Sequence, residues 1–116
     1  MRGRGGFDGS VLGTLWRNRY LGCAMAVRRS FLSLALPMPP RIPMHDMWLG
    51  ALGSTLGQVT YLPCPYLQYR RHESNVTPTR SKASSMQQMR WRSALAVAIA
   101  SRALAVKLGL HAPARQ

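Results

Sequence analysis

Acidic residues are almost absent from this chain of 116 residues, in which three acids face sixteen Lys and Arg. The formal net charge at pH 7 is therefore +13. An excess of this size indicates a polyanionic partner or surface, and nucleic acid, phosphates and an anionic membrane are all candidates. A chain separated from an acidic second half would show the same imbalance, so the sequence leaves both interpretations open.

Other features are also missing, and each absence excludes a class of protein. The two cysteines, Cys23 and Cys64, have no second pair, which argues against a zinc site and predicts free thiols, with one disulfide as the alternative. No run of about 18 apolar residues is present, so no membrane-spanning helix is expected. Charged residues interrupt residues 1–30, so no secretory signal is expected either. The expected location is the cytoplasm, with peripheral contact to the inner face of the membrane as an extension.

What is present is enough apolar sequence for one small packed domain, since 47% of the residues are hydrophobic. Residues 1–17 are rich in Gly and Arg and predict a flexible lead-in. The apolar run 21–27 predicts a buried strand, and residues 31–36 predict one or two helical turns. Regular structure is then excluded by four prolines, at positions 37, 39, 40 and 43.

Asp46 follows the proline loop and predicts a helix N-cap, with the helix over 47–56 and closed by Gly57. Residues 59–62 and 66–69 predict two short strands, separated by a Pro-Cys-Pro bend. The resulting order of strands and helices is typical of a mixed α/β protein. Because the strands are few, the sequence predicts a piece that completes a larger sheet.

A long final helix is expected over residues 86–108, capped by Ser84 or Ser85 after a polar loop. One face of this helix carries an apolar stripe of Trp91, Leu95, Ile99 and Val106, with Arg92, Arg102 and Lys107 elsewhere. Packing on the domain is the commoner use of such a stripe, and contact with an anionic membrane is the alternative.

Two clusters contain residue types that can carry chemistry. In residues 43–48, Asp46 follows a rigid loop and could take a proton from an attacking hydroxyl, although a helix cap is the simpler interpretation. In residues 69–75, Arg70, Arg71 and His72 suit a phosphate and metal site, with manganese favoured somewhat over magnesium. A solvated basic loop is the simpler interpretation of this second cluster.

Four motifs taken in order resemble the second half of family-two glycosyltransferases, similar to bacterial rhamnosyltransferases and other polysaccharide-building enzymes. The resemblance covers about residues 18–79. Its motifs are Asn18-x-Tyr20-Leu21-Gly22-Cys23-Ala24-Met25-Ala26-Val27-Arg28-Arg29, Leu36-Pro37-x-Pro39, Ile42-Pro43-Met44-His45-Asp46-x-Trp48-x-Gly50 and Tyr69-Arg70-Arg71-His72-x-x-Asn75-Val76-Thr77.

The resemblance implies an α/β fold, as the acceptor-side half of a GT-A αβα sandwich with a C-terminal helix. It divides the chain into a flexible lead-in (1–17), an acceptor-side part (18–80) and a C-terminal helix and tail (81–116). The implied activity is inverting transfer of a sugar from a nucleotide-sugar donor to a saccharide acceptor, in cell-surface polysaccharide synthesis.

The same resemblance assigns roles to six residues. Asp46 becomes the catalytic base, and His45 and Trp48 contact the acceptor. Arg70 and Arg71 lie near the leaving diphosphate, and His72 approaches a divalent metal, Mn or Mg, in the complete enzyme.

The chain departs from the family in its first half. It shows no nucleotide-binding βαβ start and no Asp-x-Asp to hold the metal. We therefore expect the isolated chain to be inactive. Either a separate chain supplies the missing N-terminal half as a partner, or this chain is a truncated or frameshifted product. The alternative function is that of a small basic nucleic-acid-binding protein, which the net charge supports.

Overall fold

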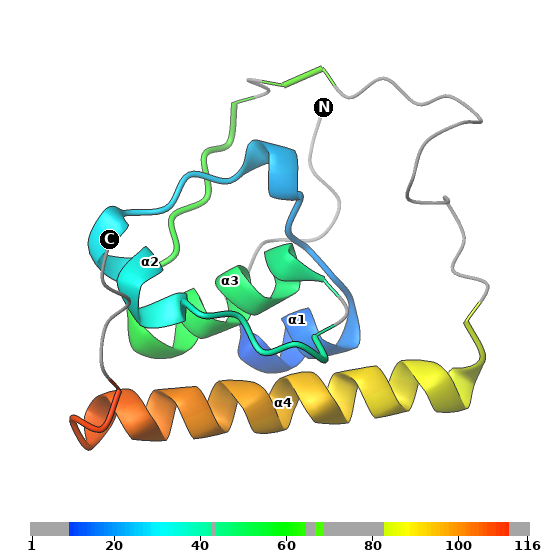
Figure 1. Ribbon diagram of the computed structural model, residues 1–116. Helices are drawn as coiled ribbons and strands as arrows, with labels where there is room; N and C mark the ends of the chain where they lie inside the picture. The colour runs from blue at the N-terminus through cyan, green and yellow to red at the C-terminus, as the bar shows by residue number, and fades with distance from the viewer. Residues whose placement is uncertain (1–9, 43, 65–66, 69–82, 112–116) are drawn as a thin grey trace.

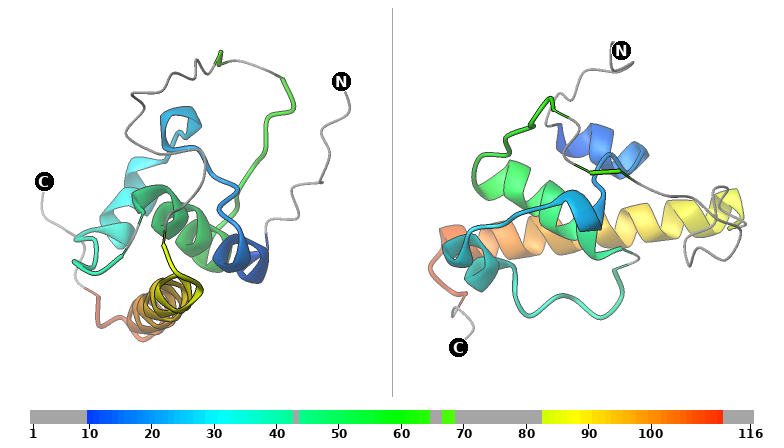
Figure 2. Two further views of the ribbon diagram at one scale, coloured as in Figure 1. Left: turned by 90° about the vertical axis from the view of Figure 1, so that its right-hand side faces the viewer. Right: turned by 90° about the horizontal axis from the view of Figure 1, so that it is seen from above.

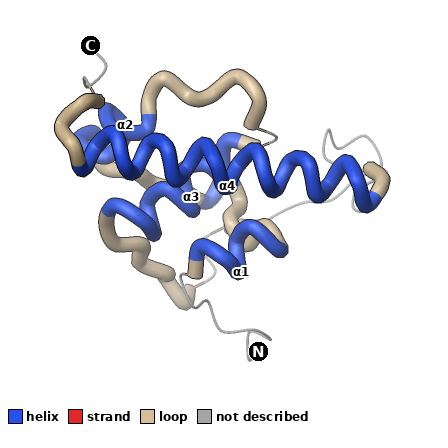
Figure 3. Tube along the Cα trace, turned by 90° about the horizontal axis from the view of Figure 1, so that it is seen from below, coloured by secondary structure: helices blue, strands red, loops and turns tan. Residues whose placement is uncertain are grey.

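The computed structural model describes residues 10–42, 44–64, 67–68 and 83–111 (Figure 1). These residues form helices and connecting segments, and none of them lies in a strand (Figure 3). The elements are α1 (Val11–Trp16), the 3-10 helix η1 (Gly22–Ala24), α2 (Arg29–Ala35), α3 (His45–Leu56) and α4 (Ser85–Lys107). The expected α/β fold, a partial GT-A αβα sandwich, is therefore wrong for the part of the chain that the structure describes.

The predicted strands fail because none has a paired neighbour among the described residues. Residues 21–27, expected as a buried strand, form η1 and extended segments on either side, with Cys23 and Ala24 exposed. Residues 59–62 have no regular structure, and Tyr61 and Leu62 are exposed. Of the second expected strand, 66–69, only residues 67–68 are described. A strand without a partner leaves its backbone groups to water, so an apolar run alone does not produce one.

Helix α1 occupies the end of the segment that the composition predicts as a flexible lead-in. Ser10 begins it, because the Ser10 hydroxyl accepts a hydrogen bond from the Gly13 amide at 3.3 Å. The Thr14 hydroxyl donates to the Ser10 carbonyl at 3.0 Å, so the buried Thr14 is satisfied. Helix α1 packs against both α3 and α4, which makes it part of the folded unit.

Helices α2 and α4 confirm two predictions. The short helix expected over 31–36 is α2, and the long helix expected over 86–108 is α4. Ser84 is the N-cap of α4, and its hydroxyl accepts from the Gln87 amide at 3.2 Å. Helix α4 follows from local signals, a Ser cap and a helical spacing of apolar residues, whereas α2 has no side-chain cap at its start.

Helix α3 begins two residues earlier than expected. Its N-cap is Met44 and its first residue is His45, so Asp46 stands inside the first turn and the prediction that it is the N-cap is wrong. The helix ends at Leu56 and its C-cap is Gly57, as expected. The Asp46 carboxylate still lies near free amide groups at the start of the helix, where a negative charge is favourable.

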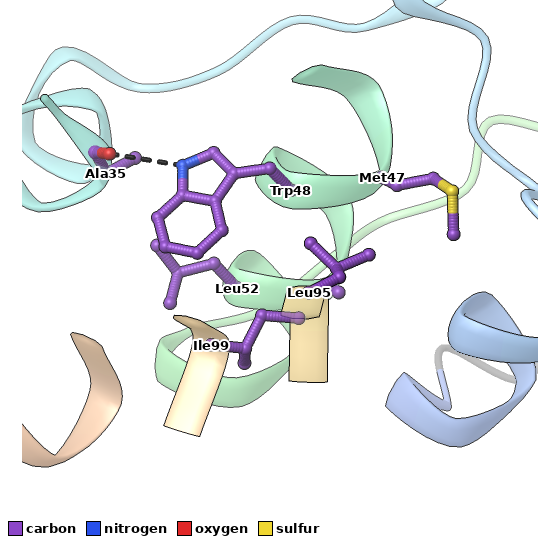
Figure 4. Close-up of a cluster of buried hydrophobic side chains, with 7 residues drawn as sticks. Ala35, Met47, Trp48, Leu52, Leu95 and Ile99 are labelled. Carbon is purple, nitrogen blue, oxygen red and sulfur yellow. Dashed lines mark hydrogen bonds between the residues drawn. The ribbon is translucent and has the colours of Figure 1, made fainter. Parts of the chain in front are cut away.

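The hydrophobic core lies where α3 meets α2 and α4 (Figure 4). It consists of residues buried on three helices, namely Ala35, Met47, Trp48, Ala51, Leu52, Leu95 and Ile99. The expected apolar stripe of α4 supplies two of them, which confirms that this face packs on the domain. Helix α4 runs along one side of the other helices, and residues 57–64 lie on the far side of α3 (Figures 1 and 2).

Arg102 of α4 joins this core to the end of α2. Its guanidinium donates to the carbonyl oxygens of residues 34 and 36 at 2.8 and 3.2 Å, and of residue 37 at 2.7 Å. It also lies over the Trp48 ring, 5.4 Å from the ring centroid. Partial burial lowers the pKa of Arg102 from its ordinary value. The last carbonyls of a helix have no partner within it, so Arg102 serves as a tertiary cap for α2.

Gly50 provides a test of how α3 meets the segment before η1. A Cβ atom at Gly50 would overlap the ring of Tyr20. In an unhindered helix, Ala is more stable than Gly by about 1 kcal/mol. At Gly50 the overlap with Tyr20 adds an overpacking cost of about 1–3 kcal/mol, which outweighs this gain. We therefore expect Gly50→Ala to lower the free energy of unfolding, as measured by urea denaturation.

Gly53→Ala is the matched control on the same helix. A Cβ atom at Gly53 would lie 3.4 Å from a methyl group of Val59 and 3.6 Å from the Phe31 ring. This variant keeps or raises stability. Equal stabilisation by both substitutions would contradict the close approach of Tyr20 to α3.

Candidate functional site

The Asp46 carboxylate, in the first turn of α3, is held by two hydrogen bonds. Its Oδ1 atom accepts from the Met47 amide at 2.8 Å, and its Oδ2 atom accepts from the Asn18 side-chain amide at 3.1 Å. Asp46 is partly buried and is the one acid among the described residues. Each carboxylate oxygen has a second lone pair, so the group can still accept a proton or a further hydrogen bond.

Asn18 is a site residue to which the sequence assigned no role. Its Oδ1 atom accepts from the Tyr20 amide at 3.0 Å, and its Nδ2 atom lies 3.5 Å from the Met44 sulfur as well as bonding Asp46. Asn18 thereby fixes the segment before η1 against the start of α3. The available signal was its place at the head of the first motif, 28 residues before Asp46.

His45 lies beside Asp46 and is exposed. Its Nε2 atom is 2.7 Å from the position that a Cβ atom on Gly22 would take. The ring therefore rests on the backbone of η1, in space left by the glycine. The structure thus brings together the first and third motifs of the sequence, around Asn18, Gly22 and Asp46.

Trp48 occupies a different environment from the one expected of an acceptor-contacting residue. Its side chain is 0% exposed, and its indole Nε1–H donates to the Ala35 carbonyl at 3.1 Å (Figure 4). Two residues along a helix correspond to a rotation of about 200°, which places Trp48 and Asp46 on opposite sides of α3. The indole therefore presents no surface to a ligand.

A small groove of about 140 Å³ adjoins the site between α1 and α4. Asn18 and Met44 line its end nearest Asp46, and two aromatic rings, Trp16 and Trp91, line it together with apolar and polar side chains. Arg92 also lines the groove, but its guanidinium is held by Trp16: it donates to the Trp16 carbonyl at 2.8 Å and lies 4.8 Å from the Trp16 ring centroid. Since ligand pockets usually span about 300–1,000 Å³, this groove suits only a small group.

The predicted diphosphate and metal residues Arg70, Arg71 and His72 lie outside the described residues. Among the residues that are described, no group of three or more His, Cys, Asp or Glu could hold a metal ion. A divalent cation of the Mg or Mn type needs about six ligands, mostly oxygen atoms. Asp46 and its neighbour His45 do not supply such a set, so the expected metal does not fit the described part of the site.

The sequence predicted free cysteine thiols and no membrane-spanning helix, and the described residues bear on both predictions. Cys23 and Cys64 are both exposed and unbonded, as expected of free thiols. Within the described ranges, no helix combines the length and the apolar character that crossing a membrane requires.

Comparison with known proteins gives no relative of this chain. No family model matches it, and no curated protein and no solved structure matches it either. The likeness to family-two glycosyltransferases therefore depends on the four motifs alone.

Replacing Trp48 distinguishes a core residue from a pocket residue. Trp48→Ala removes a fully buried indole, so we expect the free energy of unfolding to fall by about 3–5 kcal/mol. The neighbouring exposed residue gives the control, since His45→Ala changes stability by less than about 0.5 kcal/mol. Urea denaturation followed by circular dichroism measures both. A Trp48→Ala protein as stable as the parent would mean that the ring is not in the core.

Proposed function

We propose that the chain is the acceptor-side part of a cytoplasmic glycosyltransferase that builds cell-surface polysaccharide. It would transfer a sugar, with inversion, from a nucleotide-sugar donor to a saccharide acceptor. The observation that carries the proposal is the Asp46 carboxylate, fixed by Asn18 and the Met47 amide at the start of α3. The order of the four motifs supports it, and no fold relationship is used in the argument.

In the proposed reaction, Asp46 acts as the general base. An acceptor hydroxyl attacks the anomeric carbon of the donor sugar, a new carbon–oxygen bond forms, and the bond to the diphosphate breaks. The diphosphate leaves with the bonding electrons, and the hydroxyl proton passes to the Asp46 carboxylate. Because a sugar hydroxyl is a weak acid, transfer of this proton as the bond forms lowers the barrier.

The contacts of Asp46 suit this role. The Asn18 amide and the Met47 amide each bind one carboxylate oxygen, which fixes the plane of the group and leaves a lone pair on each oxygen. The neighbouring His45 is exposed and available to hydrogen-bond the acceptor. Arg70, Arg71 and His72 remain our candidates for contacting the departing diphosphate, and the donor-binding half is expected from sequence outside this chain.

Asp46→Asn tests the base assignment in a protein that joins this chain to a donor-binding half. We expect sugar transfer to fall at least about 100-fold while donor binding is unchanged, because the amide cannot accept the proton. Transfer to a saccharide acceptor and donor binding by calorimetry are the two measurements. His45→Ala is the control at the adjacent exposed position, and we expect a smaller loss.

Unchanged transfer by Asp46→Asn would refute the assignment of the base.

Reading the coding DNA before the Met1 codon in three frames gives an independent check of the proposal. We expect a βαβ start with an Asp-x-Asp sequence there, and its absence would favour a binding protein.

The alternative function, nucleic-acid binding, is favoured by the net charge of +13. It predicts tight binding to duplex DNA or RNA at physiological salt. Under our proposal, binding is charge attraction alone, so the Kd rises steeply between about 50 and 200 mM salt and stays weaker than about 10⁻⁶ M at physiological salt. A salt titration by fluorescence anisotropy separates the two, since a Kd well below that value would support the alternative.

A further inference from the structure

Helix α4 carries large apolar side chains on the side that faces away from the core. Four large apolar side chains there are strongly exposed, namely Met86 (76%), Val97 (66%), Leu104 (59%) and Leu108 (60%). Their spacings of eleven, seven and four residues place them on one side of a helix that turns about 100° per residue. The buried residues of α4, Leu95, Ile99 and Ala103, lie on the other side.

The large apolar side chains of this face stand at both ends of α4, with Arg90 and Ser93 on the same side of the helix between Met86 and Val97. A helix of 23 residues is about 34 Å long, and Met86 and Leu108 stand at its two ends. Seen from below, α4 lies across the front of the molecule and no described element covers it (Figure 3). A helix on the surface of a soluble domain normally turns a polar side outward, so four large apolar side chains exposed on one side indicate that something else covers them.

The charges around this face select the kind of partner. Helix α4 contains no acidic residue, and Arg90 stands on this same side near the start of the helix, with Lys107 beside it near the end. A second copy of this chain would carry the same net charge of +13 and be repelled. An anionic lipid surface instead attracts the cations and accepts the apolar side chains, as it does for interfacial helices.

A groove beside the N-terminal half of this face provides a place for a phosphate group. It measures about 560 Å³ and is lined by Arg41, Arg90, Gln87, Met86 and Trp91, among others. Arg41 and Arg90 are both exposed, and the one described acid, Asp46, is not among the lining residues. Guanidinium groups bind phosphate in a bidentate manner, and Trp is favoured at the boundary between apolar and polar layers.

We infer that α4 docks on an anionic phospholipid surface through this outward face. Met86, Val97, Leu104 and Leu108 enter the boundary between headgroups and acyl chains. Arg41 and Arg90 bind lipid phosphate in the adjoining groove. This surface is separate from the Asp46 site, so the inference does not depend on the proposed enzymatic function.

Vesicle flotation of the full chain tests the inference. We expect binding to vesicles of phosphatidylcholine mixed with phosphatidylserine, and little binding to phosphatidylcholine alone. Val97→Gln combined with Leu104→Gln lowers the partition coefficient at least about tenfold, because two apolar side chains no longer enter the lipid. Leu62→Gln is the matched control, since Leu62 is 62% exposed in the segment on the far side of α3 (Figure 1).

Single charge substitutions test the groove. Arg41→Gln and Arg90→Gln are each expected to lower partitioning about fivefold. Arg28→Gln removes the same charge from an exposed position at the start of α2 and is expected to change partitioning less. Circular dichroism of every variant ensures that a loss of binding is not a loss of helix.

Three results would overturn the inference. The first is equal partitioning of the parent chain and the Val97→Gln, Leu104→Gln variant, which would remove the apolar face from the interaction. The second is a site for free phosphate. It would be indicated if inorganic phosphate displaced the chain from vesicles far more than chloride did at equal ionic strength, while the Val97→Gln, Leu104→Gln variant bound the vesicles as well as the parent chain. The third is a dimer in sedimentation that Leu104→Gln dissociates without changing partitioning, which would indicate an interface between copies.

Discussion

The burial of Trp48 beneath Arg102 is the contact on which the other helices depend. The indole is fully buried, donates to the Ala35 carbonyl, and lies under a guanidinium that also binds the carbonyl oxygens at the end of α2. A helix of seven residues is unstable by itself, so α2 exists because α3 and α4 together satisfy its end. One aromatic residue and one cation thereby connect three helices.

The candidate site is a consequence of the same packing. Once Trp48 points into the core, the helical rotation turns Asp46 outward on the other side of α3. Gly50 then lets the Tyr20 ring approach the helix, and the Tyr20 hydroxyl shares a hydrogen bond of 3.1 Å with Ser54. That approach brings Asn18 within 3.1 Å of the Asp46 carboxylate. The geometry around Asp46 is therefore set by packing along the whole helix rather than by the motif alone.

The sequence predicted the features that are set locally, and it failed for those that depend on distant residues. Helix α4 and its Ser84 cap are encoded within a few residues, and they were predicted correctly. The strand over 21–27 was wrong because an apolar run carries no information about whether a second strand is available to pair with it. The sequence likewise placed Trp48 with Asp46 because they are neighbours in a motif, whereas the core decides which side of α3 each residue occupies. Asn18 was overlooked as a site residue for the same reason, since its partner lies 28 residues away.

Only part of the large positive charge is available to bind a partner, because some of the cations are engaged within the fold. Arg102 is engaged with carbonyl groups at the end of α2, and Arg92 is engaged with the carbonyl and ring of Trp16. These two cations stabilise the fold and are poorly placed to neutralise an external polyanion. Arg41, Arg90 and Lys107 are exposed near the outward face of α4, beside apolar side chains that a nucleic acid backbone would leave in water. A partner that is both anionic and apolar satisfies the two features together, and a phospholipid surface has this combination whereas duplex nucleic acid does not.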